Sequence, residues 1–148
     1  MVSVPMPEDG GPRAARTAAE QEFLASLFGT RRGLDVWLHQ DEDGTPWACV
    51  SCDFAVDGAI HGTLRLDFDG HQVLGGWSPA NLNWDDGVRA AAAGVDVDGP
   101  DGLRVAGPVA DLAAAAGAWF DRHRDEWAVA RDAGRFSHRA SDAPRSWR

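Results

Sequence analysis

Residues 34–77 read LDVWLHQDEDGTPWACVSCDFAVDGAIHGTLRLDFDGHQVLGGW, and this stretch decides the fold. Apolar and polar side chains alternate along it with a period of two, which is typical of β-strands with one buried face. Three strands are expected first, and their apolar sets are Leu34, Val36 and Leu38; Ala48, Val50, Cys52 and Phe54; and Ile60, Leu64, Leu66 and Phe68. A fourth strand is expected over about 71–77.

Three turn sequences separate these strands and predict how they pair. Glu42-Asp43-Gly44 and Val56-Asp57-Gly58 each suit a three-residue loop with glycine in the left-handed conformation, and Asp69-Gly70 suits a two-residue type I′ turn. The pairs that these loops place opposite one another are Trp37 and Cys49, His39 and Trp47, Asp53 and His61, and Leu66 and Val73. Every apolar set then lies on one side of the sheet, and a one-residue slip would break that agreement.

Helical spacing of apolar residues flanks the strands. It predicts a first helix over 14–28 that stops at Gly29, and a long final helix from Pro108 to about Arg131. Between the strands and that helix, Asp85 or Asp86 could cap a short helix over 88–93, and residues 103–105 could form a short strand. The predicted fold is therefore α+β: a four-stranded antiparallel β-meander with an N-terminal helix, a long C-terminal helix, and a structured loop or short helix between.

Length and composition fit a single domain. The chain has 148 residues, of which 44% are hydrophobic, and we expect a disordered leader over 1–13, one domain over 14–131, and a mobile arginine-rich tail over 132–148. No run approaches the ~18 apolar residues of a membrane span, and the start lacks the features of a signal peptide. Two unpaired cysteines fit a reducing compartment. We therefore expect a cytoplasmic protein without a membrane partner.

The net charge of −9 is unevenly distributed. From Arg131 onward there are five arginines and two aspartates, so that the tail carries +3 and residues 1–130 carry −12. An acidic body disfavours nucleic acid, whose phosphates attract positive charge, and favours a basic protein partner, a cation, or simple solubility. Because the chain contains no lysine, a lysine Schiff base is excluded.

The polar side of the predicted sheet is the first candidate binding site. It should display Trp37 and Trp47 beside charged and polar residues, among them His39 and Arg65. Large aromatic residues ringed by charges resemble the centre and rim of a protein interface. The alternative is that a helix covers this face and makes the tryptophans part of the core.

The loop from Trp77 to Gly87 is the second candidate. Loops often carry function, and this one could form a pocket against the sheet in which two indoles stack a flat small-molecule ligand and amides and carboxylates bind its polar edge. The candidate residues are Trp77, Asn81, Asn83, Trp84, Asp85 and Asp86. The alternative is a structured loop whose tryptophans cover the open end of the core.

Three further patterns are better explained by structure than by chemistry. Cys49 and Cys52 form a C-x-x-C within a strand, where an offset of three puts the thiols on opposite faces. A calcium loop that starts at Asp96 needs an oxygen ligand at its fifth position and a glutamate at its twelfth, where this chain has Pro100 and Gly107. Asp53 beside His61 is half of a catalytic triad, but the sequence has no nucleophile elbow. We therefore expect no metal, no cofactor and no catalytic residues.

The loop over 75–87, together with Asp101-Gly102-Leu103-Arg104-Val105 and Ala118-Trp119-Phe120, resembles small acidic α+β proteins of GC-rich bacteria to which no activity is assigned. In architecture and charge alone, the chain also resembles the immunity proteins of bacterial toxin systems. The leading interpretation is a non-enzymatic acidic binding protein, immunity- or antitoxin-like, that occludes a basic protein partner. A small enzyme or ligand-binding domain, with its pocket between the sheet and the Trp77–Gly87 loop, is the alternative.

Overall fold

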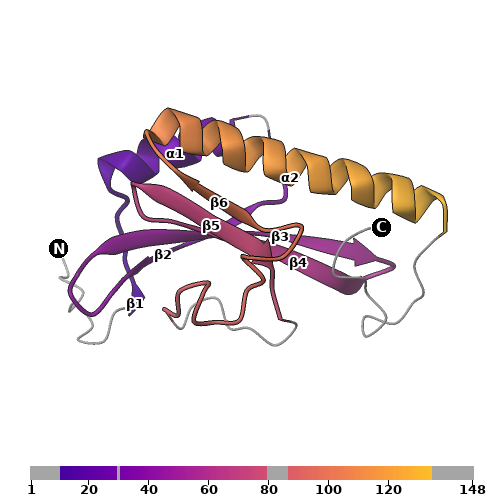
Figure 1. Cartoon of the computed structure of the whole chain (residues 1–148), viewed down its shortest axis with the longest axis horizontal. Coiled ribbons are helices and arrows are strands. Elements are labelled where there is room, and N and C mark those ends of the chain that lie inside the picture. The colour runs from indigo at the N-terminus through magenta and orange to yellow at the C-terminus, as the bar shows by residue number, and fades with distance from the viewer. Residues whose placement is uncertain (1–10, 30, 80–86, 135–148) are drawn as a thin grey trace.

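The computed structural model describes residues 11–29, 31–79 and 87–134. It is an α+β fold in which two helices lie along one face of an antiparallel sheet (Figure 1). The elements in chain order are β1 (Gly11–Pro12), α1 (Ala18–Phe28), β2 (Asp35–Gln40), β3 (Pro46–Val56), β4 (Ala59–Phe68), β5 (Gln72–Trp77), β6 (Leu103–Ala106) and α2 (Val109–Asp132).

The sheet follows the chain from strand to strand in the order β1-β2-β3-β4-β5-β6. Strands β2 to β6 are a five-stranded antiparallel meander, one strand more than the four predicted, because β6 pairs along the whole length of Leu103–Ala106 with β5. The two-residue β1 adds a short sixth strand beside the far end of β2. Residues 1–10 of the predicted leader, and 135–148 of the predicted tail, lie outside the described residues.

Both helices pack on the sheet through buried side chains on one face. Phe23, Leu24 and Leu27 of α1 are buried, and Phe23 stacks on Phe68 of β4 with ring centroids 4.0 Å apart. Helix α1 begins at Ala18 rather than at residue 14, because Thr17 and Glu20 form a capping box. In α2 the buried stripe includes Leu112, Ala116, Trp119, Phe120, His123 and Trp127.

Two consecutive glycines on β5, Gly75 and Gly76, allow close packing on both faces of the sheet. The helices cover one face, and the segment over 87–102 covers the other. A Cβ at Gly75 would lie 2.9 Å from the Trp119 ring of α2, whereas a Cβ at Gly76 would lie 2.2 Å from the backbone oxygen of Asp96, in the segment that crosses the opposite face. Neighbouring strand residues point to opposite faces. The missing side chain of Gly75 therefore leaves room for α2, and that of Gly76 leaves room for the segment around Asp96.

Two predicted pairings are wrong, each by two residues. Asp53 lies opposite Thr63 rather than His61, because the hairpin closes through Asp57-Gly58 and a β-bulge then shifts the register. His61 is buried as a result and Ile60 is half exposed, the reverse of the predicted pattern.

The β4–β5 turn produces the second shift. Phe68, not Leu66, pairs with Val73, and Leu66 pairs with Gly75. Asp69 and Gln72 flank the turn, so that its central residues are Gly70, with φ at +95°, and His71 instead of Asp69-Gly70. The pairings of Trp37 with Cys49 and of His39 with Trp47 are confirmed.

The segment over 87–102 crosses the sheet face opposite the helices (Figure 1). The helix predicted over 88–93 is absent from these described residues, which form a single turn in which the Ala93 amide donates to the Arg89 carbonyl. The turn ends at Gly94, whose φ is +82°. The sheet is therefore the middle of three layers, with helices on one side and an irregular segment on the other.

Candidate functional site

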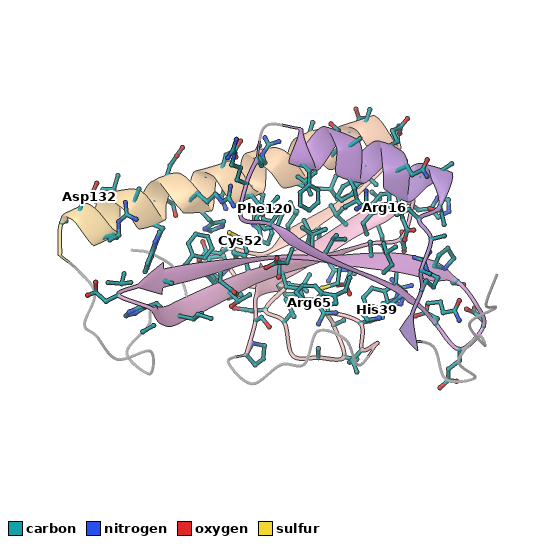
Figure 2. The ribbon with its side chains drawn as sticks, turned by 180° about the vertical axis from the view of Figure 1, so that it is seen from behind. Arg16, His39, Cys52, Arg65, Phe120 and Asp132 are labelled. Atoms are coloured by element: carbon teal, nitrogen blue, oxygen red, sulfur yellow. The ribbon has the colours of Figure 1, made fainter. Side chains whose placement is uncertain are left out.

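Most of the polar sheet face is buried, which corrects the expectation that it is displayed. Trp47, His39 and Arg65 are almost inaccessible to solvent. The segment over 87–102 covers Trp47 and Arg65, so the cover there is not the helix that was considered as the alternative. Figure 2 shows Arg65 and His39 on this side of the sheet, and Cys52 and Phe120 on the helix side.

Arg65 and Asp67 on β4 form the buried ion pair that holds this cover in place. Arg65 Nε donates to Asp67 Oδ1 at 3.1 Å, and its Nη2 donates to the Val88 carbonyl at 2.5 Å. Asp67 Oδ2 accepts the Ala90 amide at 2.5 Å. Burial raises the pKa of the Asp67 carboxyl, and the positive charge of Arg65 opposes that rise. These polar groups are occupied in attaching the segment to the sheet.

The Trp47 side chain on β3 packs against a second arginine, Arg89. The guanidinium carbon of Arg89 is 5.0 Å from the Trp47 ring centroid, within the range of a cation–π contact. Arg89 also donates to both carboxylate oxygens of Asp41, at 3.0 and 2.7 Å. The His39 ring packs on Trp47 at 4.6 Å. Trp47 is thus a fully buried packing residue on the sheet face opposite the helices.

Among the tryptophans of the described residues, Trp37 is the one that is not buried. Its indole is partly accessible to solvent. On the same sheet face, Asp35 precedes it on β2, and Asp53 and Thr63 lie opposite one another on β3 and β4. Both aspartates are exposed, and Asp53 Oδ1 accepts the Thr63 hydroxyl at 2.7 Å. We call these four residues the Trp37 surface. Asp35 lies two residues from Trp37 along β2, and Asp53 lies on β3 two residues beyond Ser51, which is opposite Asp35. The surface is therefore an aromatic side chain followed along the sheet by two solvent-facing carboxylates.

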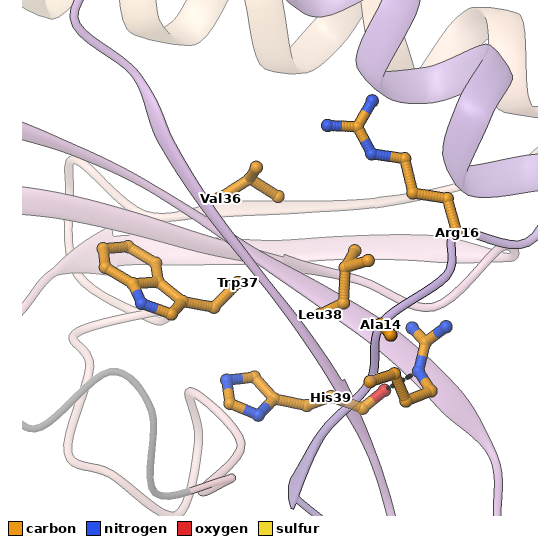
Figure 3. A pocket seen from close by; sticks show the side chains of 7 residues that line it. Ala14, Arg16, Val36, Trp37, Leu38 and His39 are labelled. Carbon is orange, nitrogen blue, oxygen red and sulfur yellow. Dashed lines mark hydrogen bonds between the residues drawn. The ribbon is translucent and has the colours of Figure 1, made fainter. Parts of the chain in front are cut away.

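A groove of about 400 Å³ borders Trp37 at the edge of β2 (Figure 3). It is bounded by β2 and by the chain that rises from β1 to α1, and its lining residues are Arg13, Ala14, Arg16, Val36, Trp37, Leu38 and His39. Figure 3 shows the side chains of Val36, Leu38 and Arg16 on one side of the strand and those of Trp37 and His39 on the other. No sequence pattern predicts this groove, because neither Arg13 nor Arg16 belongs to the alternating pattern of the strands.

The predicted pocket around Trp77 is not formed as expected. Trp77 belongs to the core on the helix side, with its ring 5.6 Å from that of His123. Its Nε1 donates to Asp101 Oδ2 at 3.1 Å, and Trp119 Nε1 donates to the Asp101 carbonyl at 2.8 Å. Trp77 therefore cannot stack a ligand at the surface. Its predicted partners Asn81, Asn83, Trp84, Asp85 and Asp86 lie outside the described residues.

The two cysteines lie on opposite faces of β3, as predicted. Cys49 is buried beneath the segment over 87–102, and Cys52 belongs to the helix-side core. Burial raises the pKa of the Cys49 thiol to about 12. Burial also raises the pKa of Cys52, against the influence of Arg124. Neither thiol is ionised near neutral pH, and the two cannot form a disulfide with one another.

The remaining chemical candidates have structural partners. Asp53 bonds to Thr63, so the predicted Asp53–His61 pair is not formed. Asp98 pairs with Arg104 at 2.9 Å, and Asp101 accepts the Trp77 indole. No group of three or more potential metal-ligating side chains gathers within the described part of the chain. The Trp37 surface and the adjoining groove are therefore the site that the geometry supports.

Comparisons with known proteins add no assignment to this site. No protein-family model, curated protein or solved structure matches the chain. A bilayer-spanning helix must be both long and apolar, and the described residues include none of that kind. What the site does must therefore be inferred from its own residues.

Proposed function

We propose that this chain is a non-enzymatic binding protein that docks a basic protein partner on the Trp37 surface. The observation that carries the proposal is a partly exposed indole on the same sheet face as two exposed carboxylates, those of Asp35, two residues away on β2, and of Asp53, further along on β3. Interfaces commonly use an aromatic anchor surrounded by polar groups, and aromatic anchors contribute much of the binding energy.

The charge of the whole chain supports the same partner. Residues 1–130 carry −12, so that a basic protein would be attracted before contact and would associate faster at low salt. The same charge repels the phosphates of nucleic acids. An immunity- or antitoxin-like role, in which the chain occludes a basic toxin, is the specific form of the proposal. Its support is charge and architecture.

The experiment is an affinity capture from host lysate with the tagged chain at low and at high salt. We expect a basic protein to be retained at low salt and largely lost at high salt. Trp37→Ala should weaken binding of the captured partner by about 2 kcal/mol or more. The double variant Asp35→Asn/Asp53→Asn should weaken it and reduce its dependence on salt.

A matched control changes the net charge equally but elsewhere. Glu22→Gln/Asp111→Asn removes two exposed carboxylates from the two helices, on the other face of the sheet. If this control weakens binding as much as Asp35→Asn/Asp53→Asn does, attraction is due to net charge alone and the Trp37 surface is not the docking site. Retention of no basic protein at either salt concentration would overturn the proposal.

A further inference from the structure

The outer edge of β2 is only half covered by β1. Gly11 pairs with Gln40 and Pro12 with His39, and the Arg13 amide donates to the Leu38 carbonyl at 2.9 Å. In an antiparallel strand, alternate residues direct both backbone groups to the same neighbour. Because the Leu38 carbonyl points away from β3, the amide and carbonyl of Val36 also point outward.

No strand of the described chain continues alongside Val36. The next residue to pair would be Ala15, but it is exposed, and its carbonyl accepts Arg13 Nη1 at 2.9 Å as the chain turns toward α1. The groove described above opens at this point, with Val36 in its wall. An open strand edge beside a groove is the geometry that an extended peptide occupies when it adds to a sheet.

The groove carries one net positive charge on a chain that is otherwise acidic. The Arg13 guanidinium is 2.5 Å from Glu20 and is neutralised by it. Arg16 is exposed and has no ion pair with the described residues. The Arg16 side chain and the Val36 side chain lie on the same side of β2 (Figure 3). A carboxylate on the strand opposite Val36 would face Arg16.

We propose that this groove binds an extended acidic peptide segment of a partner, which pairs with the Val36 backbone and presents a carboxylate to Arg16. In an antiparallel pair, residues directly opposite share a face, so the acidic residue is the one whose amide and carbonyl bond to Val36. The next residue of the peptide then packs on the Trp37 side. The inference goes beyond the proposed function, because the ligand has the opposite charge and meets Arg16 and Val36 instead of Asp35 and Asp53.

The probe is a capped hexapeptide of alternating valine and glutamate, titrated into the full chain by calorimetry. We expect binding that Arg16→Ala weakens at least tenfold, while Arg104→Ala, which removes an exposed arginine from β6 at the opposite sheet edge, leaves affinity unchanged. A peptide of alternating valine and lysine should bind at least tenfold more weakly. Equal effects of the two arginine variants, equal affinity for the two peptides, or no binding at all would overturn the proposal.

Methylated peptides test the backbone pairing without changing the protein. N-methylation of the glutamate amides should abolish binding, since these amides would donate to Val36, whereas N-methylation of the valine amides should have little effect. Equal affinity of the two methylated peptides would overturn strand addition. Asp35→Asn/Asp53→Asn should not weaken binding of the acidic peptide, so failure of this proposal and failure of the basic-partner proposal are distinguishable.

Discussion

Neighbouring aromatic residues on one sheet face have different surroundings. Trp37 and Trp47 both point away from the helices, yet Trp47 is fully buried beneath the segment over 87–102 and Trp37 is partly accessible. Strand alternation gives both the same direction, and only the position along the strand decides which one is covered. Burial therefore gives Trp47 a packing role and leaves Trp37 accessible for the binding role that we propose.

Alanine substitution at the two tryptophans should give unequal losses of stability. Trp47→Ala should lower the free energy of unfolding by about 3–5 kcal/mol, because it leaves a large cavity in a closed core. Trp37→Ala should cost less than half as much, because part of its indole already contacts water. Urea denaturation of both variants beside the parent measures this. Equal losses would show that Trp37 is as much a part of the core as Trp47, and it could not then be an interface anchor.

The two arginines that flank Trp47 should also differ. Arg65→Met should cost about 3–5 kcal/mol, because it leaves the Asp67 carboxylate buried without its partner. Arg89→Met should cost about 0–1 kcal/mol, because the Arg89–Asp41 ion pair is partly solvated. Chemical denaturation gives both values, and hydrogen exchange of the Ala90 amide reports whether the covering segment has loosened. A loss for Arg65→Met no larger than that for Arg89→Met would contradict a structural role for the buried pair.

At the scale of the elements, periodicity predicted strand identity better than strand pairing. The pairings of Asp53 and Leu66 are each displaced by two residues, and a shift of two keeps the side chains outside the β-bulge on their predicted faces. The sequence could not distinguish Asp69-Gly70 from Gly70-His71 as the centre of a turn, since both place a glycine where a positive φ is needed. The bulge at His61 has no comparable signal, and it reversed the predicted burial of Ile60.

The start of α1 offers a test of local structure. Thr17→Ala removes the hydroxyl that accepts the Glu20 amide at 3.0 Å, and it should lower the free energy of unfolding by about 0.5–2 kcal/mol. Thr17→Ser keeps the capping oxygen and should cost little. Thermal melts followed by circular dichroism give the comparison. Equal destabilisation by the two substitutions would mean that the threonine methyl group, and not the cap, is what matters.

At the scale of the whole molecule, the sheet lies between two covers of different kinds. The helices have a regular apolar stripe, which is why their positions could be predicted from the sequence. The segment over 87–102 has no period, and it is attached through Arg65, Asp67 and Arg89, residues that normally indicate exposure. A polar strand face buried by charged side chains and an irregular segment therefore looks exposed in the sequence. The same lack of pattern hid the groove at Arg16.

The helix-side core contains a histidine that should make stability depend on pH. His123 is fully buried, and its ring lies against Trp77 and Trp119. Its Nε2 is 3.1 Å from Arg122 Nη2, and because a guanidinium can only donate, this nitrogen accepts and the ring is neutral. Burial, and then the charge of Arg122, lowers the pKa of His123 below its ordinary value of 6.5.

The direction of the effect follows from that lowered pKa. Well above pH 6.5 the histidine is neutral in both the folded and the unfolded chain and does not change stability. As the pH falls below 6.5, the unfolded chain gains a proton that the folded chain resists, so the free energy of unfolding should fall by up to about 1.4 kcal/mol per pH unit. Urea denaturation between pH 7.5 and about 5 should show this loss in the parent. It should be smaller in His123→Phe, whatever that variant's stability at neutral pH. Parallel profiles for His123→Phe and the parent would show that His123 is protonated as readily in the folded chain as in the unfolded one.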